Sequence, residues 1–181
     1  MRGGRSKFWT FLRTFRKSNR KGRCAISHVT QIELSILDLD ALKAAAEKLG
    51  LEFRENQKTY KWWGRSVGDY PLPEGFKAED LGKCDHAICA PNNPGAYEIG
   101  VVERKDGEPG QVLLWDFYNN GLDYHYSGQC KGMVEYVGEG ACKLQQEYAV
   151  EVAKKYWLAQ GWQVTEERKE DGTVTLNAAQ F

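Results

Sequence analysis

The chain lacks several features that would announce a function at once. It has no apolar run near the roughly 20 residues that a membrane-spanning helix needs, and no secretory hydrophobic segment. It has only three histidines, and its five cysteines are an odd number, which does not indicate a disulfide framework. We therefore expect a soluble globular protein with free thiols in a reducing compartment, the cytoplasm.

Acidic residues are missing from the first 23 positions, which carry nine Lys or Arg. The remaining 158 residues carry sixteen basic and twenty-five acidic residues, so the neutral average hides a +9 tail and a −9 body. An acidic body repels polyanions, so binding of nucleic acid would depend on the tail. The candidate residues for that contact are Arg13, Arg16, Lys17, Arg20 and Lys21.

The tail, residues 1–26, is treated as a basic amphipathic segment that need not belong to the fold. Phe8, Phe11, Leu12 and Phe15 recur at helical spacing, which predicts a short basic helix suited to an anionic membrane or a phosphate backbone. The same composition fits an organelle transit peptide, which would place the protein in a plastid. A third interpretation is a translated leader upstream of the true start, and the sequence leaves all three open.

Residues 27–181 are predicted to form a single α+β domain, because about 150 residues suffice for one compact core. Residues 27–36 alternate apolar and polar side chains, as a half-buried strand does. Asp38 stands at an N-cap position before a helix that Gly50 ends, and a second strand is expected from Leu51 on toward Trp62 and Trp63.

The rest of the body predicts three short strands, a long second helix and a closing hairpin, separated by turn dipeptides. We expect a mostly antiparallel sheet with two main helices packed on one face, in the order β-α-β-β-β-β-α-β-β. Residues 64–83 and 119–141 are predicted to be loops. The expected strands are 84–90, 97–104, 111–118, 162–168 and 173–178, and the second helix is 142–160.

Aromatic side chains gather near the predicted strand ends and loops. Aromatic residues with an arginine commonly anchor protein interfaces and stack on bases. Strand alternation puts Trp62 and Trp63 on opposite faces, so at least one of them should serve the core. We expect the group to bind a ligand or a partner protein through Trp62, Trp63, Arg65, Tyr70, Tyr124, His125 and Tyr126.

A cluster of thiols and imidazoles raises the question of metal binding or catalysis. Cys84, His86 and Cys89 lie close together in the chain, but structural zinc sites favour paired knuckles, and no second knuckle follows. Buried thiols on a strand are the favoured interpretation. No metal ligand, cofactor or catalytic residue is therefore assigned, and a Cys–His nucleophile with His125, Cys130 or Cys142 stays an alternative without a local signature.

Residues 138–143 bring glycines to the start of the second predicted helix, where backbone N–H groups can cradle an anion. The spacing matches neither the Walker A motif nor the dinucleotide fingerprint. The other interpretation is a flexible lead-in to the helix. With the basic tail, this segment supports an alternative function as a nucleotide- or nucleic-acid-binding accessory factor.

The order of the segments and the residues within them resemble those of a known family. Residues 27–32, 38–42 and 49–51, with shorter matches at 97–100, 146–149, 160–162 and 170–174, resemble the hypothetical chloroplast reading frame thirty-five family of cyanobacteria, algal plastids and bacteriophages. Members begin at a Met-Ser-His that corresponds to residues 26–28, so the tail lies outside the family pattern. The long loops depart from the plastid pattern and suit a phage-borne member. The resemblance implies no activity, cofactor or catalytic residue.

The leading hypothesis is a non-enzymatic interaction or regulatory factor whose partner is another protein. If the protein is phage-encoded, the compartment is the host cytoplasm. The alternatives are the nucleotide- or nucleic-acid-binding factor and an enzyme with a Cys–His site. The sequence leaves the oligomeric state open.

Overall fold

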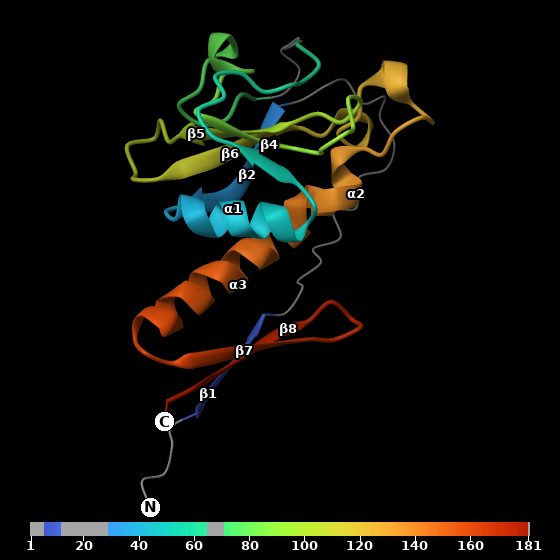
Figure 1. Cartoon of the computed structure of the whole chain (residues 1–181). Helices are drawn as coiled ribbons and strands as arrows, with labels where there is room; N and C mark the ends of the chain where they lie inside the picture. Colours follow the sequence, from blue (N-terminus) through green and yellow to red (C-terminus); the bar gives the residue numbers. More distant parts are fainter. Residues whose placement is uncertain (1–5, 12–28, 65–70, 181) are drawn as a thin grey trace, which may run out of the picture.

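Two antiparallel β-sheets lie on opposite sides of a pair of helices in the computed structural model of the chain, which describes residues 6–11, 29–64 and 71–180 (Figure 1). One sheet has five strands in the order β2-β6-β5-β4-β3, and the other has three in the order β1-β8-β7. The α+β class, the antiparallel pairing and the two main helices are confirmed. The strands of the larger sheet are β2 (Val29–Ile36), β3 (Glu52–Arg54), β4 (His86–Cys89), β5 (Ile99–Glu103) and β6 (Gln111–Asp116).

The helices form the middle of the molecule. Helix α1 packs beneath the five-stranded sheet, and α3 packs between α1 and the three-stranded sheet (Figure 1). Both main helices therefore lie on the same side of the larger sheet, as predicted. The bounds are α1 (Leu39–Lys48), a short α2 (Met133–Val137) and α3 (Cys142–Ala159). No helix among the residues described combines the length and the apolar character that crossing a bilayer requires.

The start of α1 follows the predicted chemistry. The Asp38 carboxylate caps the helix by accepting a hydrogen bond of 3.0 Å from the Ala41 amide. The chain turns back after Leu49 and enters β3. The expected long strand from Leu51 is wrong in length, because β3 ends at Arg54 and Asn56 has a positive φ of 58° that turns the chain away.

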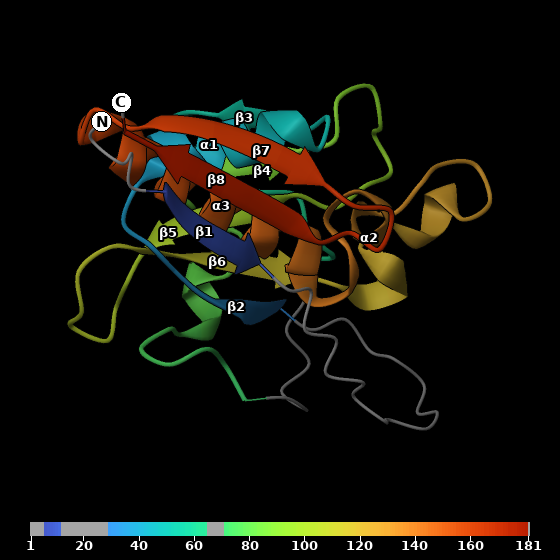
Figure 2. The same ribbon diagram turned by 90° about the horizontal axis from the view of Figure 1, so that it is seen from below.

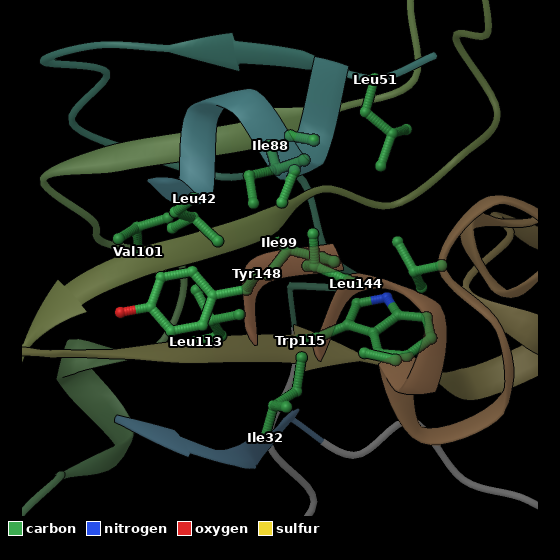
Figure 3. Close-up of a cluster of buried hydrophobic side chains, with 14 of the residues drawn as sticks. Ile32, Leu42, Leu51, Ile88, Ile99, Val101, Leu113, Trp115, Leu144 and Tyr148 are labelled. Atoms are coloured by element: carbon green, nitrogen blue, oxygen red, sulfur yellow. The ribbon is translucent and has the colours of Figure 1, made fainter. Parts of the chain in front are cut away.

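The five-stranded sheet is buried on both faces. Its helix-facing side carries Ile32, Leu113 and Trp115, which pack against Leu42 of α1 and Leu144 of α3 (Figure 3). The opposite face is covered by the loops before β4, and the residues packed there are Val29, Tyr60, Phe76, Leu81, Cys84, Ala87, Val112 and Leu114. Burial on both sides explains the near-continuous apolar run of β6.

The three-stranded sheet joins the two described ends of the chain. The predicted closing hairpin is present as β7 (Gln163–Arg168) and β8 (Val174–Ala179). Strand β1 (Ser6–Phe11) pairs antiparallel with β8, from Ser6 opposite Ala179 to Phe11 opposite Val174. Figure 2, which views the molecule from below, shows β7, β8 and β1 side by side in front of α3.

The predicted helix in the tail is therefore wrong over Phe8 and Phe11, which lie in β1. A short isolated helix is marginal in water, whereas the open edge of β8 offers backbone donors and acceptors for a whole strand. At least this part of the tail is paired with the body. Leu12, Phe15 and the basic residues Arg13, Arg16, Lys17, Arg20 and Lys21 lie outside the described residues.

Candidate binding surface

A buried carboxylate stands at the end of β6 and holds two loops. Asp116 is fully buried, and one of its oxygens, Oδ2, accepts a hydrogen bond of 3.2 Å from the backbone amide of Trp63. Its Oδ1 accepts one of 3.1 Å from the amide of Tyr118. One acidic side chain therefore fixes the segment before residue 64 and the segment after β6 to the same end of the sheet.

Lys61 links the same segment to two further loops. Its ammonium nitrogen donates to the carbonyl oxygen of Pro94 at 2.5 Å, lies 3.3 Å from Oδ2 of Asp123, and stands 5.2 Å from the ring centroid of Tyr126. Its backbone exchanges hydrogen bonds of 2.8 Å with Glu98: the Lys61 amide donates to Oε2, and the Glu98 amide donates to the Lys61 carbonyl. The ammonium group of Lys61 therefore binds within the protein, through a hydrogen bond, an ion pair and a contact with an aromatic ring.

The loop with Tyr124, His125 and Tyr126 is a 3-10 turn fixed at its start. The Asp123 carboxylate accepts a hydrogen bond of 3.1 Å from the His125 amide, and the Asp123 amide donates to the Gly95 carbonyl at 2.9 Å. Partial burial acts to raise the pKa of Asp123, but the His125 amide and Lys61 outweigh it and lower that pKa. The loop therefore has a charged anchor at its base.

Tyr126 and Trp62 both lie over glycines, which explains their partial burial. A Cβ atom on Gly95 would stand 2.6 Å from Cβ of Tyr126, and one on Gly82 would collide with the Trp62 indole. Trp62 also packs against the core on the outer face of the sheet. Of the two adjacent tryptophans, Trp62 thus serves packing, which agrees with the expectation that at least one would.

Three aromatic rings near these anchors remain exposed. Trp63 is 42% exposed, Phe117 is 41% exposed and Tyr124 is 71% exposed. His125 beside Tyr124 is exposed as well, and Tyr126 is half-buried. We call Trp63, Phe117, Tyr124, His125 and Tyr126 the aromatic surface. Arg65 and Tyr70, which were predicted to belong to it, lie outside the described residues.

Phe117, Lys61 and Asp116 were missed by the sequence reasoning. Asp116 could have been found, because a single carboxylate at the end of an apolar strand is costly to bury unless backbone donors meet it. Phe117 follows it and makes an edge contact with Trp115 at a centroid distance of 6.3 Å. The partnership of Lys61 with Asp123 joins residues far apart in the chain, and no local pattern marks it.

The thiols near the predicted Cys–His cluster have structural partners. The Cys84 thiol donates to the carbonyl oxygen of Gln57 at 3.0 Å, and the Cys89 sulfur lies 3.6 Å from Oε2 of Glu52. Burial raises the pKa of both thiols to about 12, so both are protonated at neutral pH and are poor nucleophiles.

His86 is also engaged, through its ring. Nδ1 of His86 accepts a hydrogen bond of 3.2 Å from the Asn56 amide, and the ring lies 5.4 Å from that of Phe53. In the parts of the chain that the structure describes, no group of three or more His, Cys, Asp or Glu side chains is arranged to hold a metal ion.

The glycine segment before α3 forms a tight connection with α2. A Cβ atom on Gly138 would stand 2.7 Å from the Cys142 sulfur, and the side chain of Gln145 donates to the Gly140 carbonyl at 2.8 Å. The Lys143 ammonium donates to the Glu135 carbonyl at 3.2 Å. These contacts explain why glycines occur here. A side chain at position 138 would collide with Cys142, and the positive φ of Gly138 and Gly140 lets the chain turn between α2 and α3.

Comparison with known proteins returned no match: the chain matches no protein-family model, no curated protein and no solved structure. Its function is therefore inferred from its own residues.

Proposed function

We propose that the protein is a non-enzymatic interaction or regulatory factor that binds another protein through the aromatic surface. The observation that carries the proposal is the exposure of Trp63, Phe117 and Tyr124 beside a scaffold held by Asp116 and Lys61. The proposal includes a cytoplasmic place of action, in a host cell if a phage encodes the chain, and membership of the resembled plastid and phage family.

Rigid exposed aromatics suit protein recognition for an energetic reason. Tyrosine and tryptophan bring a large contact area and lose few rotamers on binding, and they dominate the energetics of many interfaces. Here the backbone under Trp63 is tied to Asp116, and the turn that carries Tyr124 is capped by Asp123. The segments beneath the rings are thus ordered before a partner arrives, which lowers the entropic cost of association.

The electrostatics of the surface favour a protein partner over a polyanion. The positive charge of Lys61 is shared by Asp123 and a backbone carbonyl, so it is committed within the molecule. The neighbouring Asp116 adds a buried carboxylate. Nucleic-acid sites instead present unpaired Lys and Arg to phosphates.

Affinity capture with matched variants tests the proposal. Tyr124→Ala should weaken capture of the partner by roughly 30-fold, which corresponds to about 2 kcal/mol for a central aromatic anchor. Tyr156→Ala is the control, because Tyr156 on α3 is also a tyrosine and is 58% exposed, but it is far from the loop of Tyr124 in the chain. The control should bind as the unmodified protein does.

Two outcomes would contradict the proposal. One is a partner retained equally by both variants, which would move the interface elsewhere. The other is the absence of any specific partner together with thermal stabilisation by a nucleotide or an oligonucleotide, which would favour the accessory-factor alternative.

A further inference from the structure

A cavity of about 370 Å³ opens at one end of the five-stranded sheet, beside the first turn of α1. It is lined by Ile36, Leu37, Leu39, Asp85, Glu103, Gly110 and Gln111. The volume lies within the range of sites that hold small molecules. The cavity is separate from the aromatic surface, because Gln111 begins β6 and Asp116 ends it, and a strand of that length spans roughly 17 Å.

One side of the cavity is apolar and is held in place by backbone contacts. Ile36 is 1% exposed and Leu37 is 72% exposed, so the chain turns outward at the rim of the cavity. The Leu37 amide donates to the Tyr148 hydroxyl at 3.0 Å. A Cβ atom on Gly110 would stand 2.6 Å from the Ile36 carbonyl oxygen, so a side chain there would push this wall away. The cavity thus offers a formed apolar wall against which an alkyl chain can pack.

The other side of the cavity carries two carboxylates. Oδ2 of Asp85 accepts a hydrogen bond of 3.0 Å from the Glu103 amide, which brings the two acidic residues together. Among the described residues, no Lys or Arg forms an ion pair with either carboxylate. Lys105, the first lysine after Glu103 in the chain, instead lies 2.8 Å from Oδ1 of Asp80. The cavity therefore presents negative charge that the described part of the protein does not neutralise.

Gln111 gives an independent sign of a missing hydrogen-bond donor. Its side chain lines the cavity, and it lies opposite Glu103 in the register of β5 and β6. Its amide oxygen Oε1 is shielded from solvent and accepts no hydrogen bond from the described residues. A buried acceptor without a donor costs free energy. A donor placed in the cavity would satisfy this oxygen once the amide group rotates.

We propose that the cavity binds a small molecule that carries a primary ammonium group on a short aliphatic chain. The ammonium group has three N–H donors, which match the acceptors of Asp85, Glu103 and Gln111. Its positive charge complements the two carboxylates. The aliphatic chain packs on the wall formed by Ile36 and Leu37, a contact that a bare metal ion does not use.

Titration of the unmodified protein with pentylammonium, followed by NMR of the backbone amides, tests the proposal. The Gly110 and Gln111 signals should shift and reach saturation at millimolar ligand, as expected for a molecule of this size. 1-Pentanol, which lacks the charge, and methylammonium, which lacks the chain, should each bind roughly ten-fold more weakly. Equal affinity for 1-pentanol, tighter binding of Ca²⁺, or no saturable shift would overturn the proposal.

Two matched variants locate the binding site. Glu103 and Glu108 are both exposed glutamates on the β5–β6 hairpin, but only Glu103 lines the cavity. Glu103→Gln should weaken pentylammonium binding roughly ten-fold, whereas Glu108→Gln should leave it unchanged. Equal losses in the two variants would show general attraction by negative charge and refute the site.

The apolar wall has its own test. Leu37→Ala should weaken the binding of pentylammonium and leave that of methylammonium unchanged, because only the longer ligand reaches the wall. Leu37 is mostly exposed, so this variant should fold as the unmodified protein does. Equal effects on both ligands would contradict the proposed orientation of the chain.

A lysine derivative distinguishes a free amine from a protein side chain as the source of the ammonium group. N-acetyl-lysine amide should bind no more tightly than pentylammonium, because its backbone atoms lie outside a cavity of this size. Tighter binding of the lysine derivative would identify the occupant as a protein side chain and overturn the assignment to a small molecule.

Discussion

The two sheets differ in how many of their faces are buried. In β6 every residue from Val112 to Asp116 is buried, because loops cover one face and helices the other. In β8 burial alternates with every residue, since only the face toward α3 is covered, and most of β7 is exposed. We therefore expect the five-stranded sheet to be the more stable of the two, because β6 is buried on both faces whereas β7 and β8 are covered on one.

The aromatic surface stands on the stable side of this contrast. The Asp116 carboxylate accepts hydrogen bonds from the backbone amides of Trp63 and Tyr118. Asp116 is also the last residue of β6, a strand that is buried on both faces. A recognition surface gains from such a base, because ordering costs are already met. The difference between the sheets thus places the aromatic surface on the more deeply buried sheet, away from the more exposed strands β7 and β8.

The largest effect is expected from the core between the five-stranded sheet and the helices. Leu113→Ala removes a fully buried side chain from the middle of β6, and it should lower the free energy of unfolding by about 3 kcal/mol, as core cavities do. Urea denaturation followed by circular dichroism measures the loss. Leu158→Ala, at a position 56% exposed on α3, should change the same quantity by less than about 0.5 kcal/mol. Equal losses of unfolding free energy in both variants would mean that the core around Leu113 does not hold the fold together.

The second-largest effect is expected from the ion pair between Glu147 of α3 and Arg168 of β7, in which Arg168 donates to both Glu147 oxygens at 2.7 Å. Glu147→Gln leaves Arg168 facing a neutral amide in a mostly buried position, and it should cost about 2 kcal/mol of unfolding free energy. Glu55→Gln is the matched control, because Glu55 pairs with Lys43 at 2.7 Å but both side chains are about half exposed. Its loss should stay below about 0.5 kcal/mol. A neutral effect of Glu147→Gln would show that this ion pair does not stabilise the packing of β7 against α3.

The two helix-ending glycines give a smaller, paired effect. Gly50 and Gly161 have φ values of 72° and 76°, and a Cβ atom on either would meet no heavy atom within 4 Å. Alanine at each position should therefore cost only the backbone strain, about 1 kcal/mol. Hydrogen exchange separates them: Gly161→Ala should speed exchange of the amides of β7 and β8, which follow it in the chain, more than Gly50→Ala does. Identical exchange patterns in the two variants would contradict the expected difference in stability between the two sheets.

The most gradual effect is expected from pH. Burial acts to raise the pKa of Glu166, but hydrogen bonds from Lys48, Arg168 and Lys154 outweigh it and lower the pKa from 4.5 to about 2. The unfolded chain then binds more protons in this range, so the stabilisation is complete above about pH 4.5 and is lost as the pH falls toward 2. Urea titrations between pH 6 and pH 3 should show the decline, and Glu166→Gln should flatten it. A decline of the same slope in Glu166→Gln would assign the loss to other carboxyl groups.

Local patterns in the chain predicted most of the elements. Asp38 and Gly50 marked the ends of α1, and turn dipeptides marked the antiparallel strands around β5. These signals succeed because capping and turn formation involve residues within a few positions of one another. The length of β3 was overestimated, because the positive φ of Asn56 depends on a turn that its sequence neighbours do not demand.

The division into two sheets and the anchors of the aromatic surface were not predictable in this way. Strand β1 owes its conformation to β8, more than 160 positions away in the chain, and its Phe8 and Phe11 fitted a helical period equally well. The Lys61–Asp123 and Asp116–Trp63 contacts likewise join distant segments. Of the predicted site residues, Trp63, Tyr124 and His125 were located as exposed, whereas Trp62 is committed to packing.

Pulsed thiol labelling along a urea series, combined with hydrogen exchange of β8 in the same samples, tests the contrast most directly. Cys84 and Cys89 are buried with the larger sheet, and the half-buried Cys130 serves as an accessible reference. We predict that β8 amides open at urea concentrations where Cys84 and Cys89 are still protected. Labelling of both cysteines at the same urea concentrations that open β8 would contradict the account.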